Sequence, residues 1–251
     1  MNTRYNKLLL AFLCVIFAAS QLACNLSDEP PKDGPYVEYY ENGKKKLEVH
    51  YKDGHPDGLE TWWYENGRKQ GEYHYKNGEK DGLWTLWHEN GQKVYEEHYK
   101  DGKEDGLSTL WHENGQKELA GHYTNGKKEG LWTGWHANGR KSVESHYKND
   151  KLVSASGWKP DGKPSPLTKI VDGSGILVRW HENGQKAFEA HYKDGEPDGL
   201  WTQWYKNGRK QGEYHYKNGE KEGLWTQWYE NGQKESEIQY KDGKLISQKV
   251  F

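Results

Sequence analysis

The 251-residue sequence has few of the residues from which globular cores are usually built. Only 32% of its residues are hydrophobic, with four Phe and one Met among them. This shortage excludes a thick globular core, and taken alone it is typical of a disordered chain. Thirteen Trp and eighteen Tyr indicate order instead, because aromatic rings bury large apolar areas. A thin sheet that buries one aromatic layer satisfies both observations.

An excess of one charge is also missing. The chain has 36 Lys and Arg against 38 Asp and Glu, a net charge of -2, and the two signs alternate along the sequence. Phosphate binding needs clustered positive charge, so this pattern argues against nucleic acid as a partner. Interspersed charges of this kind are typical of a solvated surface.

Cysteine is scarce, with only Cys14 and Cys24. Two basic residues precede an apolar run at 8–19, which is typical of an export signal and too short for the roughly 20 residues that span a bilayer. We therefore interpret residues 1–23 as a signal peptide, and its cleavage would remove Cys14. Without Cys14, the exported chain has no intrachain disulfide.

The residues around Cys24, Leu22-Ala23-Cys24, resemble the end of a bacterial lipobox, so we predict that Cys24 is lipidated. Residues 24–35 are then the lipidated Cys and a polar, flexible tether. The expected location is the bacterial cell envelope, with the lipid anchoring the chain to a membrane. A cut after Ser20 is the alternative, and it would leave a periplasmic or secreted soluble chain.

The main positive feature is a repeat of 24 residues. Eight Asn-Gly pairs mark it, and they begin at Asn42, Asn66, Asn90, Asn114, Asn138, Asn183, Asn207 and Asn231. A fixed period of this length is typical of a repeat architecture. A series of near-identical units has no unique active site, so we expect a long binding surface instead.

One unit, Gly82 to Gly102, shows what each repeat builds. It holds two short runs of aromatic and β-branched residues, divided by Asn90-Gly91 and followed by Asp101-Gly102. Asn-Gly and Asp-Gly tolerate positive φ and reverse strands tightly. The sequence therefore predicts an all-β protein, an elongated, twisted, single-layer antiparallel sheet of tandem hairpins.

Strand alternation assigns side chains to two faces. We place the pattern Leu83-x-Thr85-x-Trp87 on the packed face together with the recurring Tyr99. The opposite face then carries a Trp column that varies between units, as a binding surface does. We predict a partner-binding role for Trp84, Trp132, Trp201 and Trp225.

Histidine recurs in two columns, one directly after the Trp87 position and one directly before the Tyr99 position. By alternation we place both on the outer face, where protonation could make partner binding pH-sensitive. The first column joins the predicted partner-binding set with His88, His112, His136 and His181. No His, Cys and carboxylate cluster has a known ligand spacing, so we predict no metal and no cofactor.

Motifs of catalysis are absent from the sequence. It has no Gly-x-Ser-x-Gly, no phosphate-binding loop and no available Cys nucleophile. Adjacent carboxylates such as Glu96 and Glu97 point to opposite faces of a strand, so they cannot act as an acid and base pair. We predict no catalytic residues and no enzymatic activity.

The pattern Gly-Leu-Trp-x-x-Trp-x-x-Asn-Gly, followed by Tyr-x-x-Gly, resembles MORN repeats, and more closely the bacterial variant of YwqK-family antitoxins. The resemblance covers residues 34–245 and implies a non-enzymatic scaffold of stacked hairpins with protein or lipid partners. Regular repeats are expected at 36–149 and, with a capping strand, at 176–251. Residues 150–175 depart from the period and contain two prolines that interrupt strand pairing, so we interpret them as a degenerate unit that either bends the sheet or is simply decayed.

Three functions follow from this reading. The first is an envelope-associated scaffold for protein-protein interaction, antitoxin-like or immunity-like. The alternative is a carbohydrate or cell-wall binding module that stacks sugars on the outer Trp column. Direct lipid binding by the repeats is the third, and the near-zero net charge argues against it.

Overall fold

A computed structural model of the protein describes residues 30–251. These residues form one sheet of 21 antiparallel strands with no helix, and strands pair with their neighbours along the chain, except that β3 and β4 both pair with β2, and β18 and β19 both pair with β17. The predicted fold class is thus confirmed. No helix in 30–251 could cross a membrane. The predicted signal peptide 1–23 and lipidated Cys24 lie outside the described residues.

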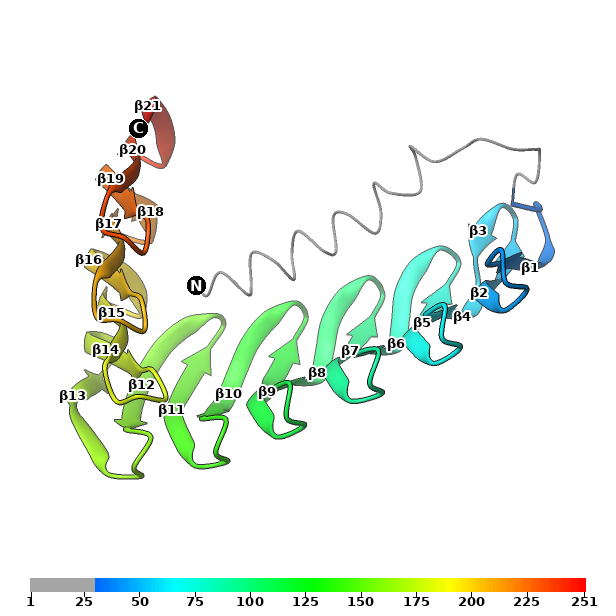
Figure 1. The fold of residues 1–251 in the computed structure, drawn as a ribbon, viewed down its shortest axis with the longest axis horizontal. Coiled ribbons are helices and arrows are strands. Elements are labelled where there is room, and N and C mark those ends of the chain that lie inside the picture. The colour runs from blue at the N-terminus through cyan, green and yellow to red at the C-terminus, as the bar shows by residue number, and fades with distance from the viewer. Residues whose placement is uncertain (1–29) are drawn as a thin grey trace.

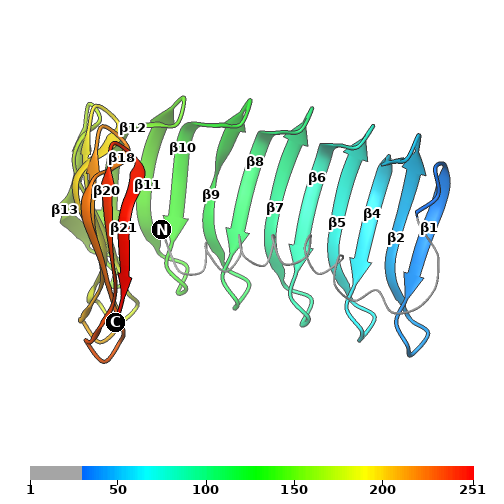
Figure 2. The same cartoon turned by 90° about the horizontal axis from the view of Figure 1, so that it is seen from above.

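The sheet has two arms that meet at an angle near β12 and β13 (Figures 1 and 2). The strands of the first arm are β1 (Gly34–Tyr39), β2 (Lys45–Lys52), β3 (His55–Pro56), β4 (Gly58–Trp63), β5 (Lys69–Lys76), β6 (Glu79–Trp87), β7 (Lys93–Lys100), β8 (Lys103–Trp111), β9 (Lys117–Thr124), β10 (Lys127–Trp135) and β11 (Lys141–Lys148).

Two strands form the corner and the rest form the second arm. The corner is β12 (Lys151–Trp158) and β13 (Pro164–Val171), which are the residues of the predicted degenerate unit. The second arm is β14 (Ser174–Trp180), β15 (Lys186–Lys193), β16 (Glu196–Trp204), β17 (Lys210–Lys217), β18 (Glu220–Lys221), β19 (Gly223–Trp228), β20 (Lys234–Lys241) and β21 (Lys244–Val250).

The two turns of a repeat differ. At the second turn, Asp101 and Gly102 both have positive φ, 48° and 77°, and join Lys100 to Lys103 as a two-residue hairpin turn. At the first turn only Gly91 has positive φ, and the Asn90 side chain accepts a hydrogen bond from the Gln92 N–H at 2.9 Å. We predicted equally tight turns at both places, whereas the first turn is a longer loop, with Trp87 paired to Lys93.

Turns of successive repeats are also bonded to each other. The Gly102 N–H donates to the Lys80 carbonyl at 2.9 Å, and the Asn77 N–H donates to the Asp57 carboxylate at 3.0 Å. At the other edge, the Asn114 amide donates to the Ala137 carbonyl at 2.6 Å. These bonds recur one repeat apart, so each unit supports the next along both edges of the sheet.

The register corrects the predicted faces. Gly82 lies opposite Tyr99, Trp84 lies opposite Glu97, and Leu83 lies opposite His98. Residues directly opposite each other share a face. The Tyr99 column therefore lies with Trp84 and not with Leu83, Thr85 and Trp87. We call the Trp84 and Tyr99 side the aromatic face, and the Leu83, Thr85 and Trp87 side the ladder face.

The bend at the corner has a local cause in β13. Gly157 pairs with Ser165, but the preceding Ser156 pairs with Lys169, so three residues of β13 stand outside the pairing. One of them is Pro166, which has no N–H to donate to a neighbouring strand. A bulge of this kind bends a strand and increases its twist.

Thr168, another residue of this bulge, holds the corner together. Its hydroxyl donates to the Val178 carbonyl at 2.8 Å and accepts from the Val178 N–H at 3.1 Å. Val178 is fully buried, so water cannot replace these bonds. Gly157 lies beside this hydroxyl, because a Cβ there would come within 2.6 Å of Thr168 Oγ1.

Aliphatic side chains are concentrated at the same corner. The cluster lies on the inside of the bend, where β11, β12, β13 and β14 meet, and consists of Val143, Leu152, Ala155, Ile170 and Leu177, with Tyr147, Phe188 and Tyr192 against it. Elsewhere a single-layer sheet offers nothing opposite its face. Only the bend lets two parts of the aromatic face pack on each other, so an ordinary hydrophobic core forms here alone among the described residues.

We expect Thr168→Val to lower the free energy of unfolding by about 1–3 kcal/mol, because it leaves the buried N–H and carbonyl of Val178 without partners. Urea unfolding followed by tryptophan fluorescence measures this. Thr124→Val, at an exposed strand end, is the matched control and should change little. Equal effects of the two substitutions would contradict the role of Thr168 at the corner.

Candidate interaction surfaces

The predicted binding residue Trp84 lies inside the aromatic face. Its ring centroid is 4.6 Å from that of Tyr73, 5.4 Å from Tyr75 and 5.1 Å from Tyr99. Tyr73 and Tyr75 belong to the preceding repeat, and only 3% of Trp84 is exposed. This Trp is therefore a packing element between two repeats, contrary to its predicted place on an outer face.

The other three tryptophans of the column are placed in the same way. Trp132 packs on Tyr123 and Tyr147 and is 3% exposed, whereas Trp201 and Trp225 are partly buried among tyrosines and Phe188. Each indole N–H donates to a backbone carbonyl ten residues earlier, as Trp84 does to His74 at 3.1 Å.

That carbonyl is available because of a bulge that the sequence analysis missed. Tyr73 pairs with Trp84 and Tyr75 pairs with Lys80, which leaves His74 and three residues of β6 outside the pairing. Gly82 in this bulge has a φ of 108°, a backbone conformation that glycine adopts without strain and other residues rarely adopt. The Asp-Gly-Leu before Trp84 and Trp201, and the Glu-Gly-Leu before Trp132 and Trp225, are the signal that could have revealed this bulge.

Charged groups lie within the aromatic face. Lys80 Nζ lies 4.0 Å from the Trp84 ring centroid and 4.5 Å from that of Tyr99, a cation-π arrangement. Burial lowers the pKa of Lys80, while Glu104 and Glu97 act to raise it. Glu97 is 6% exposed and accepts hydrogen bonds from the hydroxyls of Tyr95 and Tyr99. Burial nevertheless raises the pKa of Glu97.

The predicted binding histidines instead join one repeat to the next. His112 Nε2 lies 2.9 Å from the Trp135 carbonyl oxygen, His136 Nε2 lies 3.1 Å from that of Trp158, and His181 Nε2 lies 2.7 Å from that of Trp204. In other repeats a tyrosine hydroxyl makes the same bond, as Tyr64 does to Trp87 at 2.7 Å. His88 occupies the same position, half-buried at the first turn.

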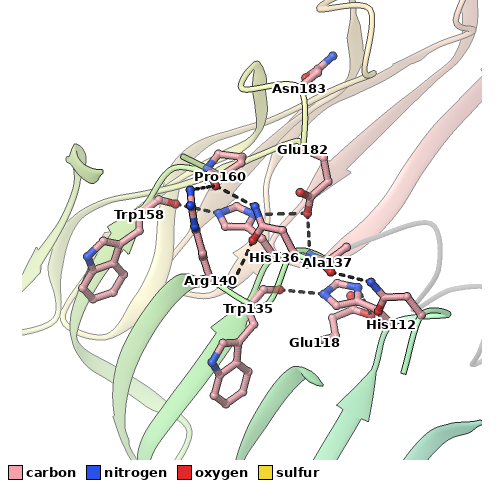
Figure 3. Close-up of polar contacts among 12 residues, drawn as sticks. His112, Glu118, Trp135, His136, Ala137, Arg140, Trp158, Pro160, Glu182 and Asn183 are labelled. Atoms are coloured by element: carbon pink, nitrogen blue, oxygen red, sulfur yellow. Dashed lines mark hydrogen bonds and ion pairs between the residues drawn. The ribbon is translucent and has the colours of Figure 1, made fainter. Parts of the chain in front are cut away.

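His136 also faces the second arm (Figure 3). Its Nδ1 lies 3.6 Å from a Glu182 carboxylate oxygen, and the same oxygen accepts a hydrogen bond from the Ala137 N–H at 2.8 Å. Only 4% of the His136 side chain is exposed. Glu182 therefore connects the first turns of two repeats across the corner, with the degenerate unit between them.

A line of aliphatic side chains, several of them exposed, lies on the ladder face. Six hairpins pair a Leu or Ile with the His that precedes the Tyr99 position; Leu83 with His98 is one example. Leu59, Leu107, Leu131 and Leu224 are 43–48% exposed, although we predicted them on the packed face. We call this line the Leu–His row; its pairs are Leu59 and His74, Leu83 and His98, Leu107 and His122, Leu131 and His146, Ile176 and His191, and Leu200 and His215, with Leu224 at its end.

The rest of the ladder face is covered by ion pairs. Lys93 forms an ion pair with Glu96 and also lies 5.4 Å from the Trp111 ring centroid of the next repeat. The same pairing recurs at Lys45 and Glu48, 3.0 Å apart, and at other repeats. Within residues 30–251 no three His, Cys, Asp or Glu side chains are grouped to hold a metal ion.

A first prediction concerns the bond between repeats. His112→Phe should lower the free energy of unfolding by about 1 kcal/mol, because the Trp135 carbonyl loses its donor. His112→Tyr should stay close to the original protein, since tyrosine makes this bond at Tyr40, Tyr64 and Tyr205. Urea unfolding of the two variants tests this, and an equal loss in both would refute the role of the bond.

A second prediction concerns the buried carboxylate. Because burial raises the folded-state pKa of Glu97 above its ordinary 4.5, the ionised group destabilises the fold at neutral pH. That cost is relieved as the pH falls through the raised pKa and is absent below about 4.5. Glu97→Gln keeps an acceptor for both tyrosines, so it should unfold at higher urea than the original protein at pH 7, with the gap closing toward pH 4. A gap of constant size would count against this account.

Comparison with known proteins agrees with this architecture. The family model described as a MORN repeat variant matches residues 32–53, 56–77, 80–101, 104–125, 128–149, 174–194, 197–218 and 221–242, which is most of the chain. No match was found among curated proteins. Each matched segment ends at a second turn, and the unmatched interval 150–173 is the corner hairpin. MORN-repeat proteins are generally non-catalytic scaffolds, and this chain belongs to the MORN repeat variant family.

Proposed function

We propose that the protein is a non-catalytic scaffold at the cell envelope, and that it binds a partner protein along the Leu–His row. The observation that carries this proposal is the line of aliphatic side chains on an otherwise ion-paired face, of which Leu59, Leu107, Leu131 and Leu224 are exposed. Exposed apolar groups that line up over many strands are typical of interaction sites. A protein that presents apolar side chains at a regular spacing could contact several repeats at once.

The histidines of the row supply its polar contacts. His74 Nδ1 lies 2.8 Å from the Leu83 carbonyl oxygen, and His98 Nδ1 lies 3.0 Å from that of Leu107. With Nδ1 donating to the backbone, Nε2 is left as an acceptor at the surface. Apolar groups beside oriented polar atoms form the usual combination at protein interfaces.

The location and the anchor are part of the same proposal. They rest on the apolar run at 8–19 and on Cys24, which the structure does not describe. A partner in the envelope, including one that the protein neutralises as an immunity protein would, fits an exported scaffold. The carbohydrate alternative relied on the rings of Trp84, Trp132, Trp201 and Trp225. At 3% exposure neither Trp84 nor Trp132 has a face free for a sugar, and Trp201 and Trp225 are partly buried among other aromatic rings.

The test is capture of partners from envelope extract by the full chain. One variant carries Leu59→Thr, Leu107→Thr, Leu131→Thr and Leu224→Thr, which replace the four exposed leucines of the row with a polar, β-branched residue that strands favour. The matched control carries Lys52→Thr, Lys76→Thr, Lys148→Thr and Lys217→Thr at exposed second-turn positions. We expect one defined protein to bind the original chain and the lysine variant and to be lost with the leucine variant.

Two results would contradict the proposal. Binding that survives in the leucine variant would remove the Leu–His row as the site. Capture of glycan and no protein by the original chain would favour the carbohydrate module. Circular dichroism of both variants establishes that they fold, so that loss of binding reports on the surface.

A further inference from the structure

The inside of the corner brings together two cations from different arms of the sheet. Lys128 is in β10 of the first arm and Arg179 is in β14 of the second, 51 positions apart in the sequence (179 minus 128). Both lie on the aromatic face, since Lys128 covers Trp132 and Arg179 lies opposite Phe188. Tyr147 and Phe188, which neighbour these two residues, pack against one aliphatic cluster.

Lys128 is held over aromatic rings. Its Nζ lies 4.6 Å from the Trp132 ring centroid and 5.2 Å from that of Tyr147. Its backbone N–H donates to the Asp150 carboxylate at 2.8 Å, which fixes the start of the strand. Burial lowers the pKa of Lys128, and the charge of Arg179 lowers it further. The effect of Arg179 is larger than the opposing effect of Asp150. The ammonium group is therefore held in one place with its charge incompletely balanced.

Arg179 is exposed, and its charge also acts on Tyr147 and Tyr192, lowering the pKa of each against the larger effect of burial. Among the described residues, neither the Arg179 guanidinium nor Lys128 Nζ has a hydrogen bond or an ion pair. Asp150 supplies one carboxylate against these two cations, so one positive charge is left unbalanced. Like charges repel each other, and the repulsion grows when the groups are partly desolvated.

At the same position in another repeat, the lysine charge is balanced by carboxylates. Lys80 lies over Trp84 and Tyr99 as Lys128 lies over Trp132 and Tyr147, but Glu97 and Glu104 are the charges that act on Lys80. The repeat can therefore supply carboxylates to this lysine. At the corner, Asp150 supplies one carboxylate to Lys128, and the other charge that acts on it is the Arg179 guanidinium.

We propose that Lys128 and Arg179 form a binding site for an oxyanion, a phosphate or a carboxylate, on the inside of the corner. A guanidinium offers paired donors to such a group, and an ammonium adds a point charge. A bound oxyanion would neutralise both cations and connect the two arms directly. The site is separate from the Leu–His row, which lies on the opposite face of the sheet.

Calorimetric titration of the full chain with inorganic phosphate, against chloride at equal ionic strength, tests the site. Arg179→Gln is the main variant, because Arg179 is exposed and its loss should leave the fold intact. Arg179→Lys keeps the charge, and Lys80→Met is the matched control, since it removes the same ring contact in another repeat. We expect phosphate affinity to fall about tenfold or more in Arg179→Gln, to be partly kept in Arg179→Lys and to be unchanged in Lys80→Met.

Thermal unfolding provides a second readout. Without phosphate at low salt, Arg179→Gln should unfold at a higher temperature than the original chain, because the repulsion of Lys128 is gone. With phosphate, the original chain and Lys80→Met should gain the most stability, Arg179→Lys less and Arg179→Gln the least. Competition by an oligoglutamate peptide identifies a protein carboxylate as the source, and its absence identifies a small free oxyanion. Equal phosphate binding by the original chain and Arg179→Gln, or none by either, overturns the proposal.

Discussion

The packing of each aromatic-face Trp between tyrosines of two successive repeats is the contact on which the rest of the structure depends. A single-layer sheet has no opposing layer, so a hairpin cannot bury its own side chains. Trp84 solves this by reaching back to Tyr73 and Tyr75 of the preceding unit while contacting Tyr99 of its own. No unit is complete alone, and stability accumulates between neighbours, as in other repeat proteins.

The hydrogen bonds follow the same arrangement. The side chain at the position of His112 or Tyr64 bonds to the Trp carbonyl of the next unit, and the turns are bonded edge to edge. Both His and Tyr occur at this position in different repeats. The position therefore requires a side chain that is long enough to donate a hydrogen bond to this carbonyl. The histidines therefore mark the junction between repeats more than they mark a site.

The degenerate unit changes the protein from a straight sheet to a bent one. Its three-residue bulge, with Pro166 inside it and Thr168 bonded to Val178, turns the sheet and brings the aromatic faces of the two arms into contact. The bend creates what the regular repeats cannot, namely an aliphatic core and a meeting of side chains distant in sequence. Lys128 with Arg179, and His136 with Glu182, are both products of the corner.

The sequence alone determined the hairpins, their period, their antiparallel order and the place where the pattern breaks, because Asn-Gly, Asp-Gly and the aromatic spacing act locally. It did not determine the faces. A register shift between Leu86 and Trp87 offsets the pairing of β6 with β7, so counting by twos put Tyr99 with Leu83 when it lies with Trp84. Only the tertiary structure decided which aromatic rings are buried, since that depends on the neighbouring repeat, and only the bend decided that Arg179 meets Lys128. Contacts across 51 positions (179 minus 128) depend on the angle of one irregular hairpin, and no local pattern encodes that angle.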